Sequence, residues 1–306
     1  MRYILENERI KAEIESLGAE LKSLVDKETG QEYMWEADPA FWGKTSPILF
    51  PFIGKLEGAA FWHEGKRIEI EKHGFARDLE FTVADPDPDK ITFYLESNED
   101  TLQKFPFRFR LEVTYLLNHK GITEKWRIVN KGSNTMYFSI GGHPAFACPP
   151  KSGGPDCGQS RTDCYLKLYD DKLQPFRKSE VRSTEIMVPE GLLSGAYFPV
   201  QVENSLIKVN EHIFDRDALC LERQGVGAVG ICDAGGREYV RLEAECPVWG
   251  IWSVPDSKAA YICLEPWWGI CDSSGYQGML KERPYTNSLA AEGTWEQGFT
   301  IRIVSA

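Results

Sequence analysis

The sequence predicts an all-β protein whose architecture is a large antiparallel β-sandwich with few short helices. The first observation is that short segments alternating apolar and polar residues recur along the whole chain. The second is that helical periodicity is scarce. The third is that 42% of the 306 residues are hydrophobic and 12% are aromatic, which is enough apolar surface for a large packed interior. No linker or charge block divides the chain, so we expect one domain over residues 1–306.

The predicted strands are rich in Val, Ile, Tyr, Phe and Trp and are separated by Gly, Pro, Asn and Asp. Their period of two is typical of antiparallel sheets with one buried face, and their number favours two large packed sheets. In chain order they are residues 67–71, 91–95, 109–117, 122–129, 135–140, 206–209, 226–232, 239–242, 248–252, 261–264 and 299–304.

The connecting segments carry signals of their own. The cluster Asn-Lys-Gly-Ser-Asn at residues 130–134 predicts a turn that joins its flanking strands into a hairpin. Short helices are expected at residues 99–104, before Pro106, and at residues 276–282. Residues 148–161 are rich in Pro, Gly and Ser, and two interpretations remain open for them: a loop that borders a site, or a surface excursion.

The charge balance restricts the possible partners. The chain has 35 basic and 46 acidic residues, giving a net charge of −11. Such a surface repels phosphate backbones and anionic lipids, so we expect neither a nucleic-acid nor a membrane partner. The first residues include several charges before any long apolar stretch, and the longest apolar run, at residues 47–53, is too short to span a bilayer. We therefore expect a cytoplasmic protein.

The eight cysteines include no Cys-x-x-Cys pair. In a long chain without an export signal, this pattern predicts free buried thiols instead of disulfides. It also offers no cluster that fits a structural zinc ion.

Two of the five histidines stand directly after predicted strands, in unusual surroundings. His73 opens the segment HGFAR, and His143 lies between a diglycine and Pro144. A diglycine permits the backbone to approach a ligand closely, and a histidine at such a strand end can transfer protons near neutral pH. The alternative interpretation is that each histidine is buried and hydrogen-bonded to the backbone.

A carboxylate stands at the end of the strand predicted at residues 261–264. Glu265 directly precedes Pro266 and the pair Trp267 and Trp268. A half-buried aromatic environment raises the pKa of a carboxyl group, which suits a general base, and flat aromatic rings suit the C–H faces of a sugar. The alternative is that a turn satisfies Glu265 and that both tryptophans pack in the core.

His73, His143 and Glu265 could instead hold a catalytic zinc or iron ion. The sequence contains no His-x-Glu, His-x-Asp or His-x-x-x-His spacing, so we expect no metal. It also lacks nucleotide-binding and nucleophile-elbow motifs, and no cofactor is expected. A pair of carboxylates working as in a glycosidase remains an open alternative, because acidic residues are plentiful.

Taken in order, several segments resemble the aldose 1-epimerase (galactose mutarotase) superfamily, and in particular its LacX-like mutarotase-related branch. The resemblance implies a galactose mutarotase-like supersandwich in which sugar binds across a concave sheet. It covers most of the chain and rests on residues 17–24 (LGAELKSL), 33–35 (YMW), 46–51 (SPILFP), 73–77 (HGFAR), 141–146 (GGHPAF) and 264–269 (LEPWWG).

The resemblance implies catalytic roles. The histidine matching His143 acts as general acid on the ring oxygen, and the glutamate matching Glu265 acts as general base on the C1 hydroxyl. The histidine matching His73 holds the substrate and steadies the charge that develops on the ring oxygen. With these roles we expect a bell-shaped pH profile, with an acidic limb from Glu265 and a basic limb from His143.

The resemblance also implies residues that bind the sugar. A basic residue shortly after the stretch at 46–51 commonly contacts the sugar; here it is Lys55, where the planar fork of an arginine is more usual. Arg77 is the other cationic candidate. The aspartate expected on the sugar hydroxyls is assigned to Asp217, with Asp215 as the alternative, and Trp267 is the expected aromatic contact.

The implied activity is that of an aldose 1-epimerase, an isomerase that interconverts the α and β anomers of a hexose by opening and reclosing its ring. Two proton transfers suffice for this, so no cofactor is required. A variant of the activity uses a hexose 6-phosphate, with Lys55 and Arg77 as phosphate partners. A different class, a non-catalytic sugar-binding or regulatory protein, needs neither His143 nor Glu265. The expected partner is a small-molecule sugar, and the expected assembly is a monomer or homodimer.

Overall fold

The computed structural model describes residues 1–151, 160–256 and 258–304. Strands make up 49% of the chain and helices 6%, which confirms the all-β prediction. The strands pair antiparallel in both large sheets. Part of the segment interpreted as a long loop, residues 152–159, lies outside the described residues.

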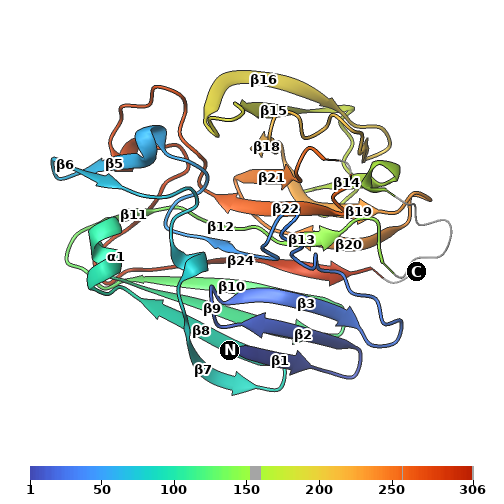
Figure 1. Cartoon of the computed structure of the whole chain (residues 1–306), viewed down its shortest axis with the longest axis horizontal. Coiled ribbons are helices and arrows are strands. Elements are labelled where there is room, and N and C mark those ends of the chain that lie inside the picture. Colours follow the sequence, from blue (N-terminus) through green and yellow to red (C-terminus); the bar gives the residue numbers. More distant parts are fainter. Residues whose placement is uncertain (152–159, 257, 305–306) are drawn as a thin grey trace.

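Two large sheets dominate the fold, with most of the eight-stranded sheet in the upper half of Figure 1. The nine-stranded sheet consists, in spatial order, of β17 (Leu206–Lys208), β14 (Tyr165–Asp170), β19 (Val226–Cys232), β20 (Glu238–Glu243), β24 (Thr294–Ile303), β10 (Gly121–Asn130), β9 (Phe109–Asn118), β8 (Lys90–Glu96) and β7 (Thr82–Asp87). The eight-stranded sheet consists of β16 (Leu193–Gln201), β15 (Glu180–Ile186), β18 (Leu219–Glu222), β21 (Val248–Trp252), β22 (Tyr261–Trp268), β12 (Ile140–Gly142) and β4 (Ile48–Leu49), with β13 (Ala145–Ala147) also on β22.

Smaller elements complete the fold. A three-stranded sheet packs against β8 and β9: the ring of Tyr3 lies 5.5 Å from that of Phe93, and Tyr115 Oη donates a hydrogen bond to the Ala19 carbonyl. The remaining elements are β1 (Arg2–Glu6), β2 (Ile10–Glu15), β3 (Glu20–Asp26), β5 (Ala60–His63), β6 (Lys66–Glu69), β11 (Met136–Phe138), β23 (Asn287–Leu289), α1 (Glu99–Lys104), η1 (Glu57–Ala59), η2 (Ala76–Asp78), η4 (Arg161–Asp163) and η5 (Leu280–Glu282). None of the helices among the described residues is long and apolar enough to cross a membrane.

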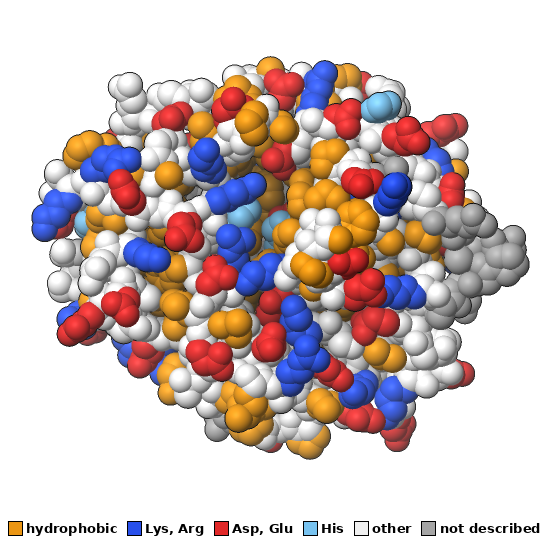
Figure 2. Space-filling view, in the orientation of Figure 1, with side chains coloured by type: hydrophobic (Ala, Val, Ile, Leu, Met, Phe, Trp, Pro, Cys, Tyr) orange, Lys and Arg blue, Asp and Glu red, His pale blue; other side chains and the backbone are white. Residues whose placement is uncertain are grey.

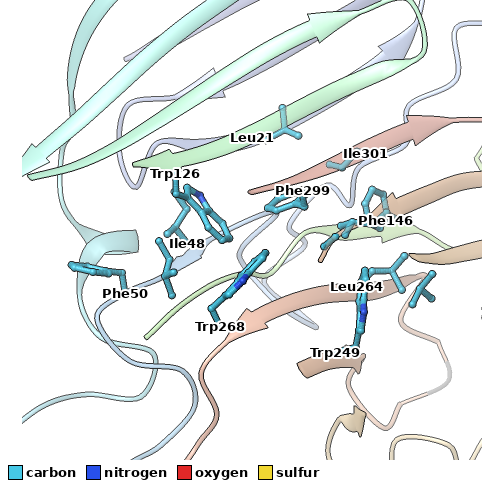
Figure 3. Packing of buried hydrophobic residues seen from close by; sticks show 14 of the residues in the cluster. Leu21, Ile48, Phe50, Trp126, Phe146, Trp249, Leu264, Trp268, Phe299 and Ile301 are labelled. Atoms are coloured by element: carbon cyan, nitrogen blue, oxygen red, sulfur yellow. The ribbon is translucent and has the colours of Figure 1, made fainter. Parts of the chain in front are cut away.

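The main core lies between the two large sheets, as Figure 3 shows. At its centre the rings of Trp126 (β10) and Trp268 (β22) meet edge to face, with centroids 5.6 Å apart. Successive residues of a strand point to opposite faces, so Leu264 and Trp268 on β22 enter this core. Glu265 and Trp267 must therefore face the other side of the sheet, which is where the candidate site lies.

Three local predictions are wrong. Residues 130–134 do not close a hairpin, because β10 pairs with β9 and β24 while β11 pairs with β23. The Asn130 amide donates instead to the carbonyls of Leu289 and Ala290, which directs the chain away from β10. The helix expected at residues 276–282 is only the single 3₁₀ turn η5. The strand expected at residues 135–140 is split into β11 and β12 at Ser139, whose N–H donates to the Pro51 carbonyl.

Other predictions are confirmed. The helix at residues 99–104 is α1, and it starts at a capping box in which Asn98 and Thr101 exchange side-chain hydrogen bonds. The strand predicted at residues 226–232 is β19, and the one at 248–252 is β21. The seven described cysteines are free thiols and all but Cys246 are buried; Cys157 lies outside the described residues.

Candidate active site

A cavity of about 200 Å³ opens on the face of the eight-stranded sheet that points away from the main core. In Figure 2 it is a hollow with histidine side chains at its bottom and Lys and Arg side chains beside it. Its walls come from strands and loops that are far apart in the sequence. The lining residues are Trp42, Ile53, Gly54, Lys72, His73, Arg77, His143, Ile186, Gly191, Asp217, Ala218, Trp252, Glu265, Trp267 and Cys271.

A larger concavity, about 910 Å³, lies on the outer face of the nine-stranded sheet. Three of its charged side chains are matched with one another: Arg127 contacts Glu112 at 3.1 Å and Glu296 at 3.3 Å. No histidine is among the described residues that line it. We therefore place the chemistry in the smaller cavity, where the predicted acid–base residues meet.

His143 follows β12 directly, and its position is set by the strand register. Gly141 pairs with Trp267 and Ala145 pairs with Cys263, so His143, midway between them, falls opposite Glu265. The two side chains meet at the bottom of the cavity, with His143 Nε2 lying 3.2 Å from Glu265 Oε2. The structure thus brings together the two residues assigned as acid and base.

The diglycine before His143 serves packing, which differs from the expected approach of backbone to a ligand. A Cβ on Gly141 would lie 2.8 Å from Trp267 Cδ1, and one on Gly142 would lie 2.6 Å from Phe299 Cε1. Each glycine therefore admits an aromatic ring, one on each face of the sheet. A Cβ on Gly250, on the other side of β22, would lie 2.4 Å from Trp267 Cζ2.

Trp267 consequently lies flat over glycines of the strands on both sides of β22 and forms an aromatic floor. Its indole Nε1 donates a hydrogen bond of 3.2 Å to Glu265 Oε2, which holds the carboxyl group at the edge of that floor. Its expected role, contact with the apolar face of a sugar, stays a prediction.

Burial dominates the electrostatics of the acid–base pair. It lowers the pKa of the His143 imidazole to about 3, and the charges of Lys72 and Arg77 act in the same direction. Burial raises the pKa of Glu265 well above 4.5, and the Trp267 hydrogen bond opposes this rise. Between these two pKa values the pair holds one proton, which resides on the carboxyl group. The pKa order is thus the reverse of the one on which the expected pH limbs depend.

His73 approaches the same cavity from the loop that precedes η2. Its backbone N–H donates to the Gly54 carbonyl (2.8 Å), and the Gly54 N–H donates to His73 Nδ1 (3.1 Å). Because Nδ1 accepts a hydrogen bond, the ring hydrogen of the neutral imidazole is on Nε2. Burial, with Lys72 next, lowers the pKa of His73 well below 6.5, so the ring is a neutral donor. Its centroid lies 5.9 Å from that of His143.

All of the predicted sugar-binding residues except Lys55 line the cavity. Arg77 and Asp217 line the cavity, whereas Asp215 is exposed and contacts His212 Nδ1 at 2.9 Å. Lys55 is not among the described residues that line the cavity. The cation that joins Arg77 there is Lys72.

Among the lining residues that sequence reasoning missed, three lie beside the two histidines. The ring of Trp42 stacks on His143 with centroids 4.7 Å apart, and Trp252 meets the same imidazole edge to face at 5.7 Å. Lys72 directly precedes His73, which was the available signal for it. Trp252 ended a predicted strand, whereas Trp42 lies outside every predicted element, so no periodicity pointed to it.

One group of side chains has the composition of a metal site. The ligand atoms of His143, Cys263 and Glu265 lie within 4.8 Å of one another, and all three residues are buried. No sequence spacing indicates this group, because His143 lies far from Cys263 and Glu265 along the chain.

The antiparallel sandwich, with a buried histidine and carboxyl group in contact beside a tryptophan ring, is that of the mutarotase-like class. The chain belongs to the aldose 1-epimerase family, whose model matches residues 1–188. It is 30% identical to the plasmid-encoded protein LacX of Lactococcus lactis subsp. lactis, with all of both chains covered.

Solved structures agree with this family. A galactose mutarotase related enzyme from Lactobacillus acidophilus has a TM-score of 0.86 and 32% identity, covering 100% of this chain and 98% of that one. A galactose mutarotase-like protein from Lactobacillus casei has a TM-score of 0.87 and 28% identity, covering 99% and 100%. These likenesses confirm the predicted superfamily and fold.

Proposed function

We propose that the protein is an aldose 1-epimerase that interconverts the α and β anomers of an aldohexose. The observation that carries the proposal is the 3.2 Å separation of His143 Nε2 and Glu265 Oε2 at the bottom of the cavity. The ring oxygen and the C1 hydroxyl oxygen of a pyranose are bonded to the same carbon. A reaction at both oxygens therefore needs a donor and an acceptor that are close neighbours.

The reaction requires one proton on the pair. When the protonated member is His143, it delivers its proton to the ring oxygen while Glu265 takes the proton of the C1 hydroxyl. The C1–O5 bond breaks, its electron pair stays on O5, and C1 becomes an aldehyde. Rotation about C1–C2 and the reverse transfers close the ring on the other face. We assign the ring oxygen to the histidine side because the His73 Nε2–H, a fixed donor, lies there.

The aromatic walls support this chemistry. Trp267 offers a flat surface to the C–H face of the sugar, and Asp217 faces the same cavity as an acceptor for hydroxyl groups. Trp42 and Trp252 enclose the His143 ring and exclude water from it. A general acid or base in such a position typically accelerates a reaction by roughly 10²–10⁴-fold.

The experiment that tests the function is polarimetry of freshly dissolved α-glucose and α-galactose, with and without the protein. We expect optical rotation to reach its equilibrium value faster with protein, in proportion to its concentration. Absence of acceleration on any aldohexose or aldohexose phosphate would contradict the proposal and favour a sugar-binding protein without turnover.

A second candidate substrate, a hexose 6-phosphate, is favoured by the cations at the cavity. Lys72 Nζ has no hydrogen bond or ion pair within the described part of the chain, and Arg77 donates only to the Lys72 carbonyl beside its contact with Asp78. If these groups bind a phosphate, Arg77→Ala and Lys72→Ala raise KM for the phosphorylated sugar much more than for the free sugar. An equal rise in KM for both sugars would mean that these cations contact ring hydroxyls or stabilise the fold.

A further inference from the structure

We propose that His143, Cys263 and Glu265 form a binding site for a thiophilic divalent metal ion such as zinc, and that the bound ion blocks the acid–base pair. The site itself rests on geometry alone. Its inhibitory consequence rests on the proposed epimerase function.

The sheet builds the three ligands into one cluster. Cys263 and Glu265 are two residues apart on β22, so their side chains point to the same face. Ala145 pairs with Cys263, and His143, two residues before Ala145, reaches the same face from the short link between β12 and β13. Two ligand atoms thus come from one strand and the third from a link held between two paired strands, which favours a defined metal geometry over a chance surface cluster.

The distances require only a small adjustment for metal binding. The ligand atoms lie within 4.8 Å of one another, and His143 Nε2 and Glu265 Oε2 are already 3.2 Å apart. A tetrahedral zinc ion with bonds of about 2.0–2.3 Å holds its ligand atoms roughly 3.5 Å apart. Closing the cluster therefore moves the sulfur by about 1 Å, which a small rotation about the Cα–Cβ bond can provide.

The chemistry of the three ligand atoms determines which metal ions can bind. One thiolate, one imidazole nitrogen and one carboxylate oxygen suit zinc, cobalt or cadmium, and they disfavour magnesium and calcium, which require oxygen ligands. Three protein ligands leave a fourth position open toward the cavity, where water or a sugar hydroxyl can bind.

The surroundings of His143 indicate a reversible ion instead of a resident one. Histidines that hold resident metals donate their second ring N–H to an acceptor. His143 Nδ1 is buried and has no hydrogen-bond partner, so this support is missing. The ion would occupy Nε2 and Oε2, which are the atoms proposed to transfer protons. Occupancy and turnover therefore exclude each other.

The test uses cobalt as a spectroscopic probe and zinc as the inhibitor. We expect Co²⁺ to give the near-ultraviolet thiolate-to-metal charge-transfer band with the wild-type protein. We expect Zn²⁺ to abolish both that band and mutarotation, and a chelator to restore the activity. A protein that shows no cobalt band would overturn the site, whatever its activity.

The decisive variant is Cys263→Ala, with Cys232→Ala as its matched control, a buried cysteine on β19. Cys263→Ala should keep basal mutarotation, lose the band and require roughly 10-fold or more zinc for half inhibition. Cys232→Ala should behave as wild type in all three respects. A band that persists in Cys263→Ala, or zinc inhibition equal in both variants, would overturn the assignment.

Two further results distinguish failure of the metal site from misfolding of a variant and from failure of the proposed function. If Cys263→Ala fails to fold, Glu265→Gln keeps the thiol and the size of the side chain but removes the carboxylate; the proposal requires it to bind cobalt at least 10-fold more weakly. If the wild-type protein shows the band but no mutarotation, the metal site stands and the proposed function fails.

Discussion

Replacing Glu265 by Gln isolates the proposed base. Glutamine keeps the size of the side chain and an oxygen that can accept the 3.2 Å hydrogen bond from Trp267 Nε1. The aromatic floor and the binding of sugar should therefore be preserved. Glutamine cannot exchange the proton that Glu265 shares with His143, so kcat should fall by roughly 10²–10⁴-fold, or about 3–5 kcal/mol of transition-state stabilisation.

The contact between His143 and Glu265 determines the result expected when both residues are replaced. His143→Asn alone should lose a similar factor. Because Nε2 and Oε2 are 3.2 Å apart and act in one step, the double variant should lose much less than the product of the single losses. His73→Asn should weaken both binding and turnover, since its proposed role is to donate a hydrogen bond to the ring oxygen.

The assay is polarimetry at several sugar concentrations, with sugar binding measured separately by calorimetry. Glu296→Gln, on the outer face of the nine-stranded sheet, is the matched control and should leave kcat unchanged. Near-normal mutarotation in Glu265→Gln would refute the mechanism. A loss confined to KM would show that Glu265 only binds the substrate.

Three further predictions follow from burial and close packing. The pH profile of kcat/KM should be bell-shaped. Its low-pH limb reflects His143, whose pKa burial lowers to about 3, and its high-pH limb reflects Glu265, whose pKa burial raises well above 4.5. The high-pH limb should vanish in Glu265→Gln. Gly250→Ala should displace the Trp267 ring, lowering the free energy of unfolding by about 1–3 kcal/mol and the mutarotation rate by roughly 10²-fold. Wild-type values in denaturant unfolding and polarimetry would contradict the placement of Trp267 against Gly250. Burial raises the pKa of Glu124 from 4.5 to about 8, so the native state retains a proton that the unfolded chain loses. Stability from this proton is present below pH 4.5 and is lost as pH rises toward 8, by roughly 1.4 kcal/mol per pH unit; Glu124→Gln should flatten that slope in denaturant unfolding at pH 5–8.

The sheets were predictable because alternation is a local signal. In β9 and β10 the buried and exposed positions follow the period of two that the sequence shows. Which strands pair with each other, however, depends on residues far apart in the sequence. The polar cluster after β10 predicts a hairpin, but the Asn130 amide finds carbonyl acceptors almost 160 residues away, and those contacts decide the path of the chain.

The catalytic candidates were predictable to a different degree. His143 follows β12 as predicted, whereas Glu265, predicted at the end of a strand, lies inside β22, which continues to Trp268. Their contact depends on the register between β12 and β22, which no single segment reveals. Trp42 reaches His143 from a loop, held in place by the Trp35 Nε1 hydrogen bond to its carbonyl. Cys263 looked like an ordinary core thiol, and only the position of His143 beside it gives it a possible ligand role.

The aromatic walls and the perturbed acid–base pair have one physical cause. Trp42, Trp252 and Trp267 displace water from the cavity, and burial is the largest influence on the pKa of both His143 and Glu265. Burial disfavours the imidazolium and the carboxylate alike, so the two pKa values move in opposite directions. A pair with widely separated pKa values keeps one proton across a broad pH range. The proposed ring opening and reclosure consume no net proton and need one to be present throughout, which is the state that such a pair would maintain.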